Sequence, residues 1–212
     1  DDFNKIAFKK NFILSAMNLA FMGYYAADKV YPYKNLYHWV DGIWAQNYTN
    51  LIKKPGRDLV RKLLIPKKVK NIFVIGNISK KSKDYLHKKT QRKVINQKLP
   101  YANIEILKSI KIKLPKHSLV FITLPTPKQE QLAYKIAEDN KEYKIICIGA
   151  SISIASGEER QVPKTLKNLE FVWRLRSDTV RRLTRILETI FYFLKGRFIL
   201  KKFLKTSFKK ID

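Results

Sequence analysis

Five short apolar runs separate the helical stretches of this chain. They occupy residues 11–17, 71–75, 103–107, 118–124 and 145–148. Each run is too short for a buried helix, and most lack the polar alternation of a half-exposed strand, so they indicate strands covered on both faces. Helical patterns lie between them. This order predicts an α/β fold, in which helices cover both faces of a parallel, Rossmann-like sheet.

Several of the predicted strands end at a residue suited to ligand binding. Asn18, Gly76, Thr126 and Gly149 each follow the carboxyl end of one apolar run. Ligands of open parallel sheets bind beyond these ends. The four positions therefore predict one binding edge, and this prediction follows from the apolar runs alone. Asn18 serves equally well as the N-cap of the next helix, and the pattern leaves both roles open.

The last part of the chain has a different pattern. From Val180 to Phe198 apolar residues recur at helical spacing, and arginines lie largely on the other side. Beyond this stretch, aromatic residues alternate with lysines up to residue 210. A basic amphipathic segment with aromatic anchors is typical of a membrane interface. The alternative is a helix that packs on the domain and leaves a basic face in solvent.

Length and charge narrow the picture. We predict that residues 1–168 of the 212-residue chain form the α/β domain and residues 169–212 an appendage. The net charge of +27 favours polyanionic partners: nucleic acid, anionic lipid or a phosphorylated substrate. No apolar run is long enough to span a bilayer. The single cysteine, Cys147, lies within a predicted strand and is interpreted as a core residue in a reducing compartment.

A metal site is not expected. His38, His87 and His117 are scattered without ligand spacing, and there is no Asp-x-Asp pair. We interpret each histidine as a surface or turn residue. The sequence thus predicts a protein that needs no metal and no other cofactor.

A strand, a small-residue loop and a set of arginines occupy residues 144–185. The loop is Gly149-Ala150-Ser151. The arginines that follow are Arg160, Arg174, Arg181, Arg182 and Arg185. Small residues let the backbone approach a ligand, and arginines pair well with phosphate oxygens. This stretch therefore suits a diphosphate.

The same stretch resembles the WecG/TagA/CpsF family of bacterial inverting glycosyltransferases. The resemblance rests on Gly149, Gly157, the triplet-like run Arg160-Gln161-Val162-Pro163 and the run from Leu169 to Leu175, LEFVWRL. Pro127-Lys128-Gln129-Glu130 matches another family motif residue for residue. By itself, the local pattern explains Thr126 as an N-cap and Pro127 as the first helical residue. It does not explain Gln129, which could hydrogen-bond a nucleotide or a sugar.

Asp41-Gly42 is first of all a turn signal. The family, however, carries an Asp-Gly-x-Gly motif at this distance, and its aspartate is the proposed catalytic base. The resemblance therefore favours Asp41 as a base. The chain departs from the family pattern at four positions, which leave the donor identity open: Trp44, Lys53, Ser153 and Phe171.

The resemblance implies a UDP-sugar donor, such as UDP-N-acetylmannosamine, and a polyprenyl diphosphate-linked saccharide as acceptor. It implies a role in cell-surface polysaccharide synthesis and peripheral attachment to the cytoplasmic face of the bacterial inner membrane. A homo-oligomer is left open. Asp41 and Arg174 are the expected catalytic residues. The expected donor-binding residues are Asn18, Gly76, Thr126, Lys128, Gln129, Gly149 and Ser151. The expected diphosphate or acceptor ligands are Arg160, Arg181, Arg182 and Arg185.

Two other classes of protein remain as alternatives. A basic nucleic-acid-binding protein explains the charge but not Asp41-Gly42 or the Pro-Lys-Gln-Glu run, and the chain lacks RNA-recognition signatures. We therefore expect no nucleic-acid partner. A catalytically inactive, membrane-associated scaffold of a polysaccharide complex would keep both the fold and the tail.

Overall fold

The computed structural model describes residues 11–27, 29–31, 33–49, 51–159, 183–184, 186–194 and 196. Their centre is a six-stranded sheet with the order β2-β1-β6-β5-β3-β4, in which all neighbours are parallel. The predicted α/β, Rossmann-like fold is thus confirmed. The strands are β1 (Phe12–Met17), β2 (Leu36–Val40), β3 (Asn71–Ile75), β4 (Lys93–Gln97), β5 (Ser118–Ile122) and β6 (Lys144–Cys147).

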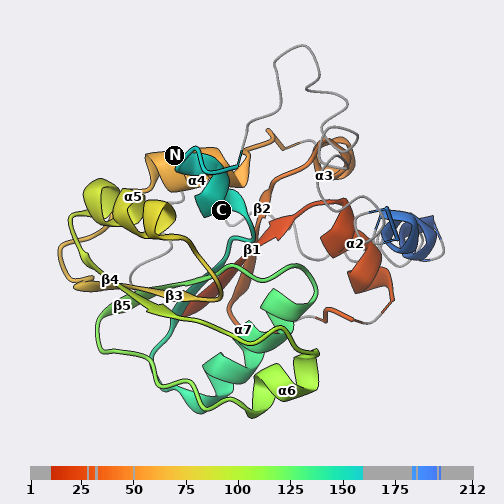
Figure 1. Cartoon of the computed structure of the whole chain (residues 1–212). Coiled ribbons are helices and arrows are strands. Elements are labelled where there is room, and N and C mark those ends of the chain that lie inside the picture. Colours follow the sequence, from red (N-terminus) through yellow and green to blue (C-terminus); the bar gives the residue numbers. More distant parts are fainter. Residues whose placement is uncertain are drawn as a thin grey trace.

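Helices cover both faces of the sheet (Figure 1). One hydrophobic core joins the sheet to α2 (Leu19–Ala26), α6 (Ile104–Ser109) and α7 (Lys128–Asp139). A second core joins the opposite face to α4 (Gly56–Lys62), α5 (Lys80–Thr90) and α8 (Ser151–Ala155). The helix α3 (Ile43–Thr49) follows β2 and buries Ala45 in the first core. Apolar strands covered on both sides are what the continuous hydrophobic runs predicted.

The neighbouring strands β1 and β6 send the chain to opposite faces. The helix after β1, α2, belongs to the first core, and the helix after β6, α8, belongs to the second. In an open parallel sheet, ligands bind beyond the carboxyl ends of the strands, where neighbouring strands are followed by segments on opposite faces. The fold therefore directs attention to the edge formed by the residues that follow β2, β1, β6 and β5.

Four predicted strands are confirmed, and one is wrong. The run at residues 103–107 forms the start of α6, because the Asn103 side chain accepts a hydrogen bond from the Ile106 N–H at 3.0 Å and caps the helix. Two strands of the sheet were not predicted: β2, and β4, whose sequence Lys-Val-Ile-Asn-Gln lacks a continuous apolar run. As the last strand in the sheet order, β4 is paired on one side only, which lowers the demand for apolar residues.

The described residues of the tail, 183–184, 186–194 and 196, are helical and pack on the α/β domain. The Phe193 ring meets Trp44 and Tyr48 of α3 edge-on, with ring centroids 5.9 and 5.6 Å apart. Thr189 is buried against Gly23 of α2. For this part of the tail, packing on the domain is confirmed, but the exposed face is not the basic one that the alternative of a packed helix expected. Its other face exposes five apolar side chains, those of Leu183, Leu187, Ile190, Phe191 and Leu194.

Two further expectations concern the tail and the membrane. None of the helices described is both long and apolar enough to cross a bilayer. The basic residues 197–210 lie outside the described part of the chain. The division at residue 168 and membrane attachment through the tail both stay predictions.

Candidate functional site

Asp41 lies directly after β2, at the carboxyl edge of the sheet. Its backbone N–H donates to the Met17 carbonyl at 3.0 Å, which continues the pairing of β2 with β1. Its carboxylate Oδ1 accepts a hydrogen bond from the Gly56 N–H at 2.7 Å. A charged acceptor makes this a strong bond, and it fixes the direction of the carboxylate. Asp41 is therefore held at the edge by two different segments of the chain.

The segment between Asp41 and Gly56 is a loop closed at its base. The Lys54 N–H donates to the Val40 carbonyl at 2.8 Å, beside the bond from Gly56 to Asp41. The loop contains α3 and returns to the start of α4. Asp41 thus combines the predicted turn role with a place at the binding edge, and the catalytic role stays a prediction.

Asn18 follows β1 and caps α2. Its Oδ1 accepts a hydrogen bond from the Phe21 N–H at 3.0 Å, which confirms the N-cap role. A Cβ atom placed on Gly42 would lie 3.5 Å from the Asn18 Cα and Cβ atoms. The turn after β2 therefore passes against Asn18. The structure brings Asn18 and Asp41 to neighbouring positions, and a role of Asn18 toward a donor stays a prediction.

The loop after β6 begins with Gly149 in the left-handed region, at φ +55°. Glycine adopts this conformation without a steric penalty. The Gly149 N–H is shared between the Ile122 carbonyl, at 3.3 Å, and the Gln129 Oε1 atom, at 3.2 Å. Two residues on, the Ser151 side chain lies directly against Gly56. The loop is thereby positioned between α7 on one side and the segment that holds Asp41 on the other.

Gln129 is almost completely buried, and its amide joins the loop to the interior. Because the Gly149 N–H is a donor, the atom facing it must be the amide oxygen. The Nε2 atom then donates to Thr126 Oγ1 at 2.9 Å and to Glu130 Oε1 at 2.8 Å. Both N–H groups of the amide are used inside the protein. Gln129 therefore supports the loop from below, while direct contact with a donor stays a prediction.

Glu130 is fully buried beneath the same loop. Its Oε1 accepts hydrogen bonds from Ser15 Oγ at 2.6 Å, from Gln129 Nε2 at 2.8 Å and from Thr126 Oγ1 at 3.3 Å. No protein atom described lies within hydrogen-bonding distance of its Oε2. Burial raises the pKa of Glu130, which the hydrogen bonds only partly counteract. The carboxyl group joins β1 to α7 directly below the candidate site.

Thr126 is not the N-cap of α7, contrary to prediction. The helix begins at Lys128 with Pro127 as its N-cap residue and no side-chain cap, and the Thr126–Pro127 peptide is cis. The Thr126 hydroxyl is instead engaged with Gln129 and Glu130. The interpretation of Pro127 as the first helical residue was also wrong, because the helix begins one residue later, at Lys128.

Gly76 and Lys128 lie apart from the other residues. Gly76 follows β3 at φ +120° and packs against the Thr123 side chain. Four strand spacings separate β2 from β3, which places Gly76 roughly 19 Å from Asp41 along the edge. The Lys128 ammonium donates to the Ala102 carbonyl at 2.7 Å, toward the segment before α6. Their roles toward a donor stay predictions, as do those of Arg160, Arg174, Arg181, Arg182 and Arg185, which lie outside the described residues.

The beginning of the arginine-rich segment is fixed by a cluster that the sequence pattern did not indicate. Glu158 Oε2 accepts hydrogen bonds from Ser79 Oγ and Ser82 Oγ, both at 2.6 Å. The Lys81 ammonium donates to the Gly157 carbonyl at 2.9 Å. The hydrogen bond from Ser79, followed by that from Ser82, lowers the pKa of Glu158. These bonds attach the chain after α8 to the first turn of α5, immediately before Arg160.

The histidines and the cysteine separate into different environments. His38 was expected at the surface, but it lies in β2 with its ring 4.6 Å from that of Phe21, and burial lowers its pKa to about 4. His117 adopts φ +57° in a turn, as expected. Cys147 is buried in β6, which confirms its core role, and burial raises its pKa. Among the residues that the structure describes, no group of three His, Cys, Asp or Glu could hold a metal ion.

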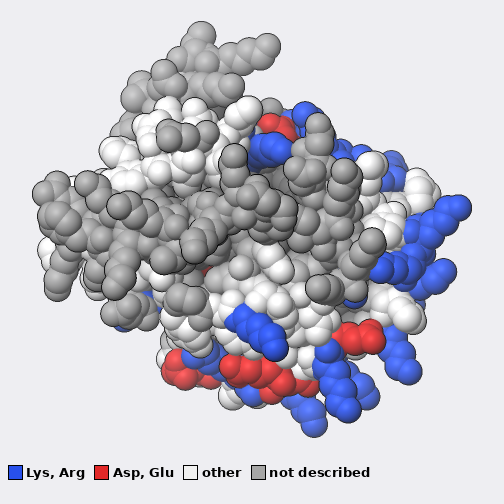
Figure 2. Space-filling view, turned by 180° about the vertical axis from the view of Figure 1, so that it is seen from behind, with Lys and Arg blue, Asp and Glu red and all other residues white. Residues whose placement is uncertain are grey.

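Positive charge is spread beyond the tail. Figure 2 shows Lys and Arg side chains gathered along the side of the molecule where α5 and β4 lie. The lysines of α5 are Lys80, Lys81, Lys83, Lys88 and Lys89. Charge alone therefore does not locate a binding site on this molecule.

Comparison with known proteins identifies a family for this chain. No curated protein matches the chain. The sequence model described as "Glycosyl transferase WecG/TagA/CpsF family" matches residues 43–207. The match contains the Pro-Lys-Gln-Glu run and the Gly149 loop, and it begins just after Asp41. Because the match covers most of the sequence, this chain belongs to the WecG/TagA/CpsF family of glycosyl transferases.

Proposed function

We propose that this protein transfers a sugar from a UDP-sugar to a polyprenyl diphosphate-linked saccharide, with inversion and without a metal ion, in bacterial cell-surface polysaccharide synthesis. One observation carries the proposal: Asp41 and the Gly149–Ser151 loop lie at the same carboxyl edge and touch through Gly56. This arrangement places a carboxylate beside a small-residue loop at the carboxyl edge of the sheet, where ligands of parallel sheets bind. Family membership supplies the reaction class.

The reaction requires three things of the protein. A base must remove the proton of the acceptor hydroxyl while its oxygen attacks the anomeric carbon. The sugar must be held so that the bond to the UDP oxygen breaks on the opposite side. Positive charge must stabilise the departing diphosphate. We assign the first role to Asp41, which takes up the proton, and the last to Arg174 with the neighbouring arginines.

The remaining assignments concern the donor. We propose that Asn18, Gly149 and Ser151 contact it, because they lie around Asp41 at the edge. Gly76, Thr126, Lys128 and Gln129 complete the proposed donor set, with Gln129 acting through the Gly149 N–H. The diphosphate is assigned to Arg160, Arg181, Arg182 and Arg185. The protein would work at the cytoplasmic face of the inner membrane.

The test is the substitution Asp41→Asn. Asparagine keeps an oxygen that can accept from the Gly56 N–H, so the loop base should stay closed, but it is not a base. We expect the affinity for UDP, measured by calorimetry in excess chelator, to stay within a few-fold. Transfer from a panel of UDP-sugars to lipid-linked saccharides should fall by about 10²–10⁴, the usual contribution of a general base.

Asp84→Asn on the exposed face of α5 is the matched control and should leave both quantities unchanged. Wild-type transfer by Asp41→Asn would reduce Asp41 to a turn residue. UDP binding without transfer of any sugar by the wild-type protein would favour the inactive scaffold. Binding of UDP only with added magnesium or manganese would refute the metal-free mechanism.

A further inference from the structure

The loop that closes at Asp41 exposes an unusual amount of apolar surface. Ile43 and Trp44 at the start of α3 are 53% and 50% exposed, and Leu51 and Ile52 after its end are 47% and 82% exposed. Removing apolar surface from water is favourable, so leaving these four side chains largely exposed forgoes a stabilisation that a partner could supply. Exposed apolar side chains grouped in this way indicate an interaction surface.

The charge of the loop selects among the occupants of this surface. Residues 42–57 contain no Asp or Glu; Lys53 and Lys54 follow Leu51 and Ile52 directly, and Arg57 comes three residues later. Apolar side chains beside cations, with a tryptophan among them, are typical of segments that lie in the headgroup region of an anionic bilayer. A protein–protein interface, by comparison, tends to exclude lysine from its centre.

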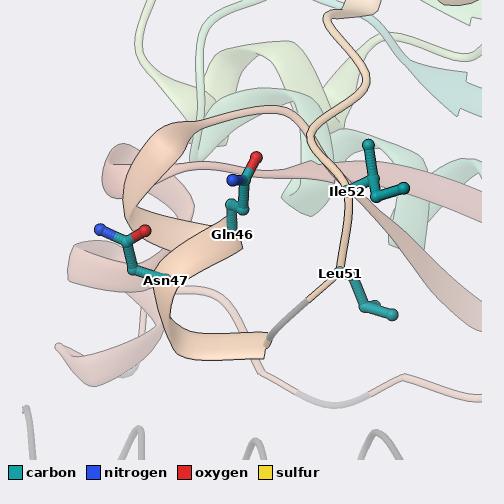
Figure 3. A pocket seen from close by; sticks show the side chains of 4 residues that line it. All are labelled: Gln46, Asn47, Leu51 and Ile52. Carbon is teal, nitrogen blue, oxygen red and sulfur yellow. The ribbon is translucent and has the colours of Figure 1, made fainter.

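The shape of the loop adds a second argument. A hollow of about 470 Å³ is lined by Gln46 and Asn47 of α3 and by Leu51 and Ile52 (Figure 3). One wall therefore offers amides and the other offers apolar groups. Gln46 Oε1 already accepts from the Lys53 N–H at 3.1 Å, which holds the returning chain beside α3. The hollow, like Asp41, belongs to the loop that Gly56 closes.

We propose that Leu51 and Ile52, with Ile43, Trp44 and the adjacent lysines, form a membrane-contacting tip that docks on an anionic bilayer at the mouth of the candidate site. The tip belongs to the loop between β2 and α4, and its Trp44 packs on Phe193 of the tail helix at one end. Its purpose rests on the proposed function, since docking here brings the head of a lipid-linked acceptor to Asp41. Vesicle binding needs no sugar transfer, so the two proposals can fail separately.

The decisive experiment places a fluorescent label on the tip. Cys147 is the only cysteine and is fully buried, so Ile52→Cys offers one reactive thiol for an environment-sensitive dye. Vesicles of phosphatidylglycerol and phosphatidylcholine are added to the labelled full chain. We expect the emission to shift to shorter wavelength and to be quenched by brominated lipid tails. Ile106→Cys on α6, where the native side chain is 51% exposed, is the matched control and should show neither change.

A second measurement tests the energetic contribution of the tip. The double substitution Leu51→Ser and Ile52→Ser should lower the vesicle partition coefficient at least tenfold, while Ile106→Ser leaves it unchanged. Both changes are on exposed side chains, so the folded state should survive, and UDP calorimetry without vesicles checks this. Full partitioning of the double variant would overturn the proposal. The proposal would also be overturned if the dye at position 52 kept its emission in water while the protein was bound to vesicles. A shift of the emission without vesicles as the protein concentration rises would indicate self-association instead and would overturn it too.

Discussion

Glu130 shows how one buried residue can serve a site that it never touches. Replacing it with leucine removes the acceptor for Ser15, Thr126 and Gln129. Each donor left unsatisfied in the interior costs about 1–3 kcal/mol. We expect Glu130→Leu to lower the free energy of unfolding by at least that amount and to weaken UDP binding, because Gln129 no longer holds the Gly149 N–H. Chemical denaturation and calorimetry measure the two effects.

The conservative variant separates positioning from general damage. Glu130→Gln keeps an oxygen that accepts the same hydrogen bonds, so its affinity for UDP should return to near the wild-type value. Gln131→Leu changes the next residue, which is half-buried and whose side chain donates only to the Lys29 carbonyl among the contacts described, so it should leave UDP binding intact. Equal loss of UDP affinity in Glu130→Gln and Glu130→Leu would contradict the positioning role.

His38 should make stability depend on pH. Its pKa is about 4 in the folded protein, below the ordinary value of 6.5, because burial disfavours the charged ring. The unfolded chain therefore binds a proton first as the pH falls, and the stabilising contribution present above pH 6.5 is lost progressively toward pH 4. The slope from this one group is at most about 1.4 kcal/mol per pH unit.

A comparison with His38→Gln isolates this effect. The raised pKa of Glu130 acts in the opposite sense, since folding then favours the protonated carboxyl group as the pH falls. The difference in unfolding free energy between wild type and His38→Gln should narrow or reverse between pH 7 and pH 5. A difference that does not change with pH would contradict the prediction.

The role of Gln129 marks the limit of prediction for single residues. The local pattern left Gln129 unexplained, and its role toward a donor stays a prediction. Its partners inside the protein could not be inferred from nearby residues, because one of them, Glu130, also bonds to Ser15 from a strand far away in the sequence. The N-cap role of Asn18, one of two that the pattern left open, and the core role of Cys147 are confirmed, since capping and burial in an apolar strand depend on nearby residues alone.

At the scale of elements, α2 and the tail helix are in such close contact that adding one methyl group at Gly23 tests whether they pack together. A Cβ atom on Gly23 would lie 2.5 Å from the Thr189 carbonyl oxygen. Helix propensity alone would make Gly23→Ala stabilising by about 1 kcal/mol. We expect the opposite sign, with a lower melting temperature and faster proteolysis of the tail, because the tail helix must move away.

Gly42→Ala serves as the steric control, since its added Cβ would meet only ordinary contacts at 3.5 Å. It should not accelerate cleavage of the tail. Stabilisation by Gly23→Ala would mean that the tail helix does not rest on α2 in solution.

The same scale shows which elements a sequence pattern predicts. Strands covered on both faces, such as β3 and β5, carry continuous apolar runs that identify them. The edge strand β4 does not, and the apolar positions 104–107 were mistaken for a strand although Asn103 is a good N-cap. The tail helix has apolar side chains both on the face that packs on the domain and on the exposed face. The periodicity of its apolar residues therefore could not distinguish packing on the domain from contact with a membrane.

For the whole molecule, the tail and the loop tip are expected to act together at a bilayer. Deleting Lys195–Asp212 removes basic residues that each contribute about 1 kcal/mol near an anionic surface. We expect this truncation to lose most of its cosedimentation with anionic liposomes, while UDP binding persists. The remaining partitioning should depend less on salt, because apolar contacts of the tip contribute more of it.

DNA added as a competitor tests the alternative partner. Polyanion binding by charge alone would let DNA displace the liposomes at low salt. Full-length protein that ignores anionic liposomes would contradict attachment through the tail.

The pairing of β1 with β6 has a consequence for how the molecule is made. Phe12 pairs with Lys144 and Ser15 with Cys147. The sheet is therefore continuous only after the first strand has paired with the last. Contacts between distant parts of a chain slow folding, because the intervening loop must be ordered first. During synthesis, β1 and β2 can pair early, as can β3 with β4, yet the two groups join only through β5 and β6. The edge that holds Asp41 and Gly149 is therefore completed at the end of folding, and a nascent chain that stops before β6 has no site at all.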